Sequence, residues 1–133
     1  MFAQLLWSTL VYLFFSSLVI LATIWVFLRL TKYNDWEQIQ QGNIAAALAL
    51  GGKVFGVGNI MRFAITTNSS ITDTLIWGAV GMVLMLLVYL MFEWLTPKIN
   101  INSEIGENAN KAVGFMSLVF SVSFSFIIGA SIT

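Results

Sequence analysis

The chain has 133 residues, of which 59% are hydrophobic and 9% are charged, whereas a soluble domain carries about 25% charged residues. Six basic residues balance six acidic ones, so the charge gives no indication of a nucleic-acid partner. Cysteine and histidine are absent, which excludes disulfides, thiolate nucleophiles, imidazole bases and Cys/His metal sites. The composition predicts a protein surrounded by lipid, with no cofactor and no metal.

Four apolar stretches are each long enough to cross a membrane, which takes about 20 residues. They span residues 5–30, 42–63, 74–95 and 108–132. No Lys or Arg precedes the first stretch, so we expect a retained helix and not a cleaved signal peptide. Pro97, the only proline, follows the third stretch, where a helix should end. The expected fold is all-α, a single membrane domain over 1–133 with four transmembrane helices.

The basic residues near the polar connections predict the orientation of the chain. Those beside the connections 31–41 and 97–107 are Arg29, Lys32, Lys98 and Lys111. Only Arg62 lies near the second connection. Because cytoplasmic loops are enriched in Lys and Arg, the first and third connections are predicted to be cytoplasmic and both termini to lie outside.

When the sequence is shifted by 65 residues, it matches itself near the ends of the first and third apolar stretches and near the starts of the second and fourth. The matching pairs are Phe27 with Phe92, Leu30 with Leu95, Thr31 with Thr96, Asn43 with Asn108, and Ala47 with Ala112. Each copy would hold two membrane spans, so the copies would be parallel. We predict two copies of one helical hairpin, at about 5–66 and 70–133.

Small residues form a stripe on the second and on the fourth stretch. The stripes consist of Ala45, Ala49, Gly52, Gly56 and, in the fourth, Ser117, Ser121, Ser125 and Gly129. Small residues let helix backbones approach closely in lipid. We therefore predict that the second and fourth helices pack centrally and that the bulkier first and third lie outside. The alternative is that small residues are simply common in membrane helices.

Lys53 lies about ten residues inside its stretch, and so about 15 Å deep, near the middle of a core about 30 Å thick. A lysine at that depth costs about 2.5–3.5 kcal/mol, so its charge should face protein or water. Two interpretations are open. One is a site for an anion, a lipid headgroup or a proton, with four candidate neighbours: Ser117, Ser121, Asn59 and the shallower Glu93. The other is a lysine stem that extends towards a subunit interface.

Asn43 and Asn108 begin the two even stretches. Asparagine at such a position accepts hydrogen bonds from the first backbone N–H groups of a helix, which are costly to leave unpaired in a membrane. The alternative is that the two side chains face each other and line a cytoplasmic vestibule.

The segment Gly42-Asn43-Ile44-Ala45-Ala46-Ala47-Leu48, followed by Gly51-Gly52, resembles the YjfL-like family of bacterial inner-membrane proteins, whose function is unknown. The second copy keeps Asn108 and Ala112 but has Glu107 and Lys111 where the first has Gly42 and Ala46. The resemblance implies a multi-pass inner-membrane protein, which would make both termini periplasmic. In some genomes, relatives look to be encoded beside envelope-stress proteins similar to the phage-shock coat protein.

Two functional hypotheses follow. The first is a non-catalytic scaffold or accessory protein that forms homo-oligomers through its small-residue faces and binds a cytoplasmic protein through 31–41 and 97–107. The second is an oligomeric channel or transporter with an anion-favouring path involving Lys53. An enzyme is disfavoured, because the polar groups at membrane depth supply no nucleophile with a matching base.

Overall fold

The computed structural model describes residues 1–30, 34–95 and 103–132. Within these ranges, four helices are long and apolar enough to cross a membrane. They are α1 (Phe2–Leu30), α3 (Ile44–Thr67), α4 (Ile71–Leu95) and α5 (Lys111–Ser131). The connections contain a short helix, α2 (Asp35–Gln40), and a π-helical turn, η1 (Ser103–Glu107). The four predicted spans are confirmed, whereas Lys32, Pro97 and Lys98 fall outside the described residues.

Side-chain caps mark where the helices begin. Asn34, Asn43 and Asn110 each accept a hydrogen bond from the first turn of α2, α3 and α5, respectively. At α4, Ser70 Oγ accepts from the backbone N–H of Asp73 at 3.2 Å. Such caps satisfy N–H groups that have no partner inside the helix. Gly42, at φ +86°, makes the left-handed turn between α2 and α3 that a residue with a Cβ rarely adopts.

The last helix begins three residues after its predicted start near Asn108, and Asn108 does not cap it. Helix α5 begins at Lys111 and its cap is Asn110, whose Oδ1 accepts from Ala112 N at 3.1 Å. The two capping asparagines, Asn43 and Asn110, are 67 positions apart. The offset of 65 therefore does not align the starts of α3 and α5, and the proposed hairpin repeat remains a sequence-based prediction.

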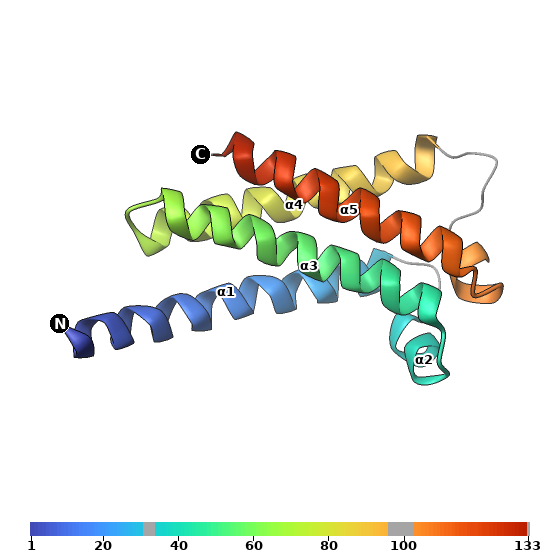
Figure 1. Cartoon of the computed structure of the whole chain (residues 1–133), viewed down its shortest axis with the longest axis horizontal. Helices are drawn as coiled ribbons and strands as arrows, with labels where there is room; N and C mark the ends of the chain where they lie inside the picture. The colour runs from blue at the N-terminus through green and yellow to red at the C-terminus, as the bar shows by residue number, and fades with distance from the viewer. Residues whose placement is uncertain (31–33, 96–102, 133) are drawn as a thin grey trace.

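Helix α3 lies at the centre of the bundle. It packs most extensively against α5, and it also contacts α4, α1, α2 and η1. Figure 1 shows α3 between α1 and α5, with the N-terminal end of α1 extending beyond the α3–α4 turn. The buried residues of α1 are Thr23 and Phe27, both in its C-terminal half. The prediction of a central second span therefore agrees with α3, whereas α5 is buried to about the same degree as α4.

Helices α3 and α5 meet backbone to backbone. A Cβ added to Gly114 would lie 2.6 Å from the carbonyl oxygen of Ala45, and one added to Gly52 would lie 2.7 Å from Leu118 Cα. Atoms at these distances overlap, so only glycine fits. The other small residues of the two stripes are also buried: Ala49, Gly56, Ser117, Ser121, Ser125 and Gly129. The stripes therefore make contacts inside the chain.

Candidate functional site

Lys53 is buried inside the bundle, with 2% of its side chain exposed. Its Nζ donates a hydrogen bond to the carbonyl of Ala49 at 3.3 Å. The same Nζ lies 4.7 Å from the centre of the Tyr89 ring and 5.4 Å from that of Phe27. A cation over aromatic faces is attracted by the electron density of the rings, more strongly where water is excluded. The ammonium therefore has partners on α1 and α4 as well as on its own helix.

Two carboxylates act on this ammonium. Glu93 and Asp35 both interact electrostatically with Lys53. Glu93 Oε1 also accepts a hydrogen bond from the hydroxyl of Tyr89 at 3.1 Å. Asp35, in the first turn of α2, is only 2% exposed. We call Lys53, Tyr89, Glu93 and Asp35 the Lys53 cluster, and these four residues join α2, α3 and α4.

Asp35 and Tyr89 are the residues of this cluster that the sequence did not indicate. The only carboxylate that the sequence suggested near Lys53 was the shallower Glu93, and residues 31–41 were predicted only as a polar connection. In the structure, α2 begins at Asp35 and packs against α3. The short helix α2, at the end of the bundle, thus provides a second carboxylate beside Lys53, in addition to Glu93 on α4.

The other predicted neighbours of Lys53 face a different side of α3. Asn59 Nδ2 donates to Ser125 Oγ at 3.1 Å, and Ser125 Oγ donates to the carbonyl of Val122 at 2.6 Å. Ser117 and Ser121 are buried on α5, in the contact with α3. The serines and Asn59 therefore belong to the α3–α5 contact, whereas the rings beside Lys53 come from α1 and α4. Of the four predicted neighbours of Lys53, only Glu93 belongs to its cluster.

Asn43 connects three segments at the opposite end of the bundle from the N-terminus. Its Oδ1 accepts from Ala46 N at 3.1 Å, which caps α3. Its Nδ2 donates to Ile105 O at 2.7 Å and to Gln38 Oε1 at 3.0 Å. The side chain therefore links α2, α3 and η1. Asn43 is buried, whereas Asn108 is exposed, and the amide of Asn43 bonds to Ile105 and not to Asn108. The capping interpretation of Asn43 agrees with this geometry.

The remaining residues of the predicted repeat motif lie on the surface. Gly42, Ala47 and Ala112 are exposed, and the first of them forms the turn before α3. Among the residues that the structure describes, no group of three or more acidic side chains is placed to hold a metal ion. Two open grooves lie beside α1, one along its N-terminal half and one along its middle, and Lys53 lines neither of them.

Replacing Asn43 with alanine should lower the free energy of unfolding by about 2 kcal/mol, because the helix cap and the link to η1 are lost together. Asn43→Ser keeps a capping oxygen but has no amide, so it should recover about half of the loss. Chemical unfolding of the protein in detergent micelles measures both. If Asn43→Ser were as stable as the wild type, the link to Ile105 would contribute nothing, and if the alanine and serine variants were equally stable, the cap would contribute nothing.

Residues 1–132 match the model of the Domain of Unknown Function DUF350. The chain belongs to the DUF350 family.

Relatives in the DUF350 family are membrane proteins by name. The UPF0719 transmembrane protein YshE of Bacillus subtilis is 46% identical over 80% of this chain and 79% of its own length. The UPF0719 inner membrane protein YjfL of Escherichia coli K12 is 29% identical over 77% of this chain and 76% of its own. A UPF0719 transmembrane protein of Aquifex aeolicus is 32% identical over 87% of this chain but 44% of its own.

These matches confirm the resemblance to the YjfL-like family and, with the four apolar helices, a multi-pass membrane protein. No solved structure matches the chain. The family description gives no activity, so a functional proposal has to come from the geometry of the chain.

Proposed function

We propose that this DUF350 protein is a non-catalytic scaffold or accessory protein of the bacterial inner membrane. The observation that supports the proposal is the burial of Lys53. Intramembrane charges usually mark a transport path when they line a water-filled cavity. Here the ammonium is 2% exposed, lies over two rings and interacts with two carboxylates. A scaffold does not by itself require a charge at membrane depth, and these contacts within the bundle give Lys53 a structural role that is compatible with one.

The partner surface in this proposal is the end of the molecule that carries α2 and η1. Of the predicted docking connections 31–41 and 97–107, residues 34–41 and 103–107 are described. Trp36, Glu37 and Gln40 on α2 are exposed, and an exposed aromatic side chain is a common contact residue in protein interfaces. Asn43 links α2 to η1, so both connections would be held as one surface. The partner would be a cytoplasmic protein, and the envelope-stress setting implied by the resemblance gives a class of candidates.

The cytoplasmic placement of this end rests on the distribution of Lys and Arg along the chain. The homo-oligomer in the proposal has to use another surface than the small-residue stripes. Ala45, Ala49, Gly52 and Gly56 are buried within the chain itself. A second copy would therefore contact the faces that are exposed to lipid.

No chemistry is part of this proposal, because the chain has neither cysteine nor histidine. The alternative function is an oligomeric anion path involving Lys53. It requires the ammonium to reach water, and therefore an arrangement in which the rings of Phe27 and Tyr89 move away from it.

Purified protein reconstituted into liposomes distinguishes the two functions. We expect chloride flux no greater than in protein-free liposomes, for the wild type and for Lys53→Met alike. Flux that depends on the protein would overturn the scaffold proposal, and its loss in a Lys53→Met protein that is still folded, as its tryptophan fluorescence reports, would assign the path to the lysine. Equal and negligible flux would support the scaffold.

A further inference from the structure

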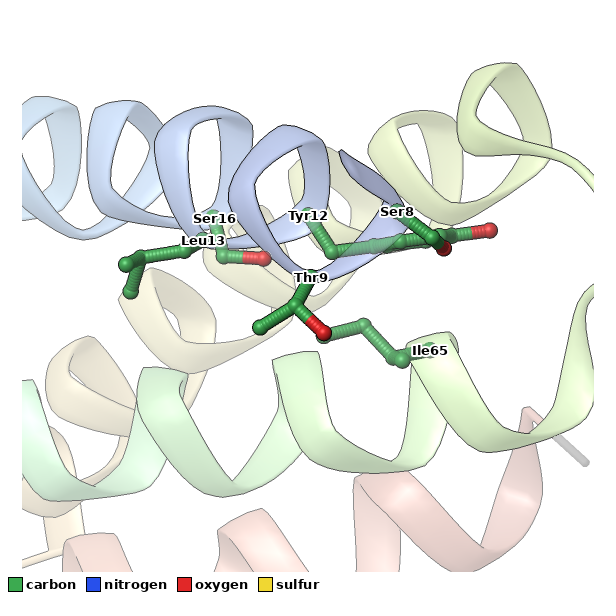
Figure 2. Close-up of a pocket in the computed structure, with 6 residues that line it drawn as sticks. All are labelled: Ser8, Thr9, Tyr12, Leu13, Ser16 and Ile65. Atoms are coloured by element: carbon green, nitrogen blue, oxygen red, sulfur yellow. The ribbon is translucent and has the colours of Figure 1, made fainter. Parts of the chain in front are cut away.

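The N-terminal half of α1 leaves an open groove between itself and α3. The groove has a volume of about 520 Å³ and is lined by Ser8, Thr9, Tyr12, Leu13, Ser16 and Ile65. Figure 2 shows these side chains on the side of α1 that faces α3, with Thr9 and Ile65 on opposite walls. Four of the six lining residues carry a hydroxyl, whereas a surface that meets only acyl chains has no use for polar groups.

The groove opens at one end of the bundle. Ile65 lies two positions before the end of α3 at Thr67, next to the short turn into α4. A helix rises 1.5 Å per residue, so Ser8 to Ser16 covers about 12 Å along the membrane normal. The hydroxyls therefore begin at the membrane interface, where a phospholipid has its phosphate and ester oxygens, and continue into the outer hydrocarbon, where its acyl chains begin.

The Ser16 hydroxyl differs from the other hydroxyls of α1. Thr9 and Ser17 donate to the carbonyl four residues earlier, at 2.8 and 2.6 Å, which is the usual way to satisfy a hydroxyl within a helix. Ser16 Oγ is buried and has no hydrogen-bond partner among the described residues. A buried polar atom without a partner is unfavourable, so the inner end of the groove lacks a polar group that a ligand can supply.

Arg62 adds positive charge at the same end of the bundle. It lies one turn before Ile65 on α3 and is exposed, with its guanidinium 4.7 Å from the centre of the Phe63 ring. Basic side chains at the membrane surface attract anionic headgroups. A second groove, of about 300 Å³ between α1 and α4, is lined by apolar residues such as Phe15 and Leu75. That groove offers no polar contact, so it fits acyl chains of any lipid.

We propose that the groove between α1 and α3 binds one anionic glycerophospholipid. The ester oxygens contact the outer hydroxyls of α1, the guanidinium of the exposed Arg62 attracts the phosphate, and one acyl chain follows Leu13. This site is separate from the Lys53 cluster, and it exists whether or not the protein is a scaffold. Lipid bound there fills the space beside the otherwise unsupported half of α1.

Native mass spectrometry of the purified protein in detergent tests the site. The protein is titrated with phosphatidylglycerol and with phosphatidylcholine of the same acyl chains. We expect tighter binding of phosphatidylglycerol by the wild type. Ser16→Leu fills the inner end of the groove and should weaken that binding about tenfold, about 1.4 kcal/mol. Ser17→Leu is the matched control, because Ser17 is exposed and does not line the groove.

Arg62→Gln should remove the preference for the anionic lipid and leave the phosphatidylcholine affinity unchanged. If Ser16→Leu does not fold, Tyr12→Phe removes a lining hydroxyl while keeping the ring, and should weaken binding about threefold. Equal phosphatidylglycerol binding by the groove variant and by Ser17→Leu would overturn the proposal. So would equal binding of the two lipids by the wild type. A dimer that disappears in Ser16→Leu would identify a second copy as the occupant, and would overturn it as well.

Discussion

Gly52→Ala should destabilise the protein by about 1–3 kcal/mol, whereas the same change at the adjacent Gly51 should be neutral or slightly stabilising. The new methyl at position 52 would lie 2.7 Å from Leu118 Cα, a backbone atom that can move only if α5 moves. At position 51 nothing lies within 4 Å of the added Cβ. Alanine also favours a helix by up to about 1 kcal/mol over glycine. Two neighbouring glycines should therefore respond in opposite directions.

Unfolding with increasing SDS in mixed micelles, followed by tryptophan fluorescence, gives the free energy for both variants under the same conditions. Gly114→Ala provides a second test of the same contact, because its methyl would lie 2.6 Å from the carbonyl oxygen of Ala45. If Gly52→Ala were as stable as Gly51→Ala, the two helices would not meet as closely as described.

Lys53→Met should cost about 3–5 kcal/mol of the free energy of unfolding, the range measured when one member of a buried charged pair is removed. The methionine fills a similar volume, but Asp35 and Glu93 lose the cation with which they interact. Because Asp35 is only 2% exposed, its carboxylate has little access to water in compensation. Lys111→Met is the matched control, since Lys111 is exposed at the start of α5, and it should change stability by less than about 0.5 kcal/mol.

A double-mutant cycle separates the contribution of the electrostatic interaction between Lys53 and Asp35 from that of packing. Asp35→Asn in the Lys53→Met background should cost less than Asp35→Asn alone, because the acid no longer has a cation to lose. The same micelle unfolding measures all four proteins. Additive effects, or a Lys53→Met variant as stable as the wild type, would show that the lysine does not depend on Asp35 and extends towards lipid.

The sequence was sufficient for the parts of the fold that depend on local pattern. Four apolar stretches give four spans, and the spacing from Ala45 to Gly52 and Gly56 correctly selects Gly52, not Gly51, for the contact with α5. The burial of Lys53 also follows from its depth.

What the sequence did not predict depends on tertiary contacts. The segment Asn108-Ala109-Asn110 offers two asparagines, either of which can cap a helix, and identity with Asn43 favoured the one that is not used. From the sequence, Asp35 is expected in an exposed connection, and it is buried only because α2 packs against α3. The π-helical turn at Ser103–Glu107 has no local sequence signal, since its carbonyls accept from Asn43, a residue 62 positions earlier.

The burial of Lys53 also bears on how the chain enters the membrane during synthesis. Helix α3 is the least apolar of the four spans, so it is the one least able to partition into lipid alone. Two partners of Lys53, Tyr89 and Glu93, lie on α4, which leaves the ribosome after α3. Only three residues, Asn68 to Ser70, separate the two helices. If α3 and α4 insert together, as one hairpin, Lys53 enters the bilayer with the ring of Tyr89 and the carboxylate of Glu93 already beside it.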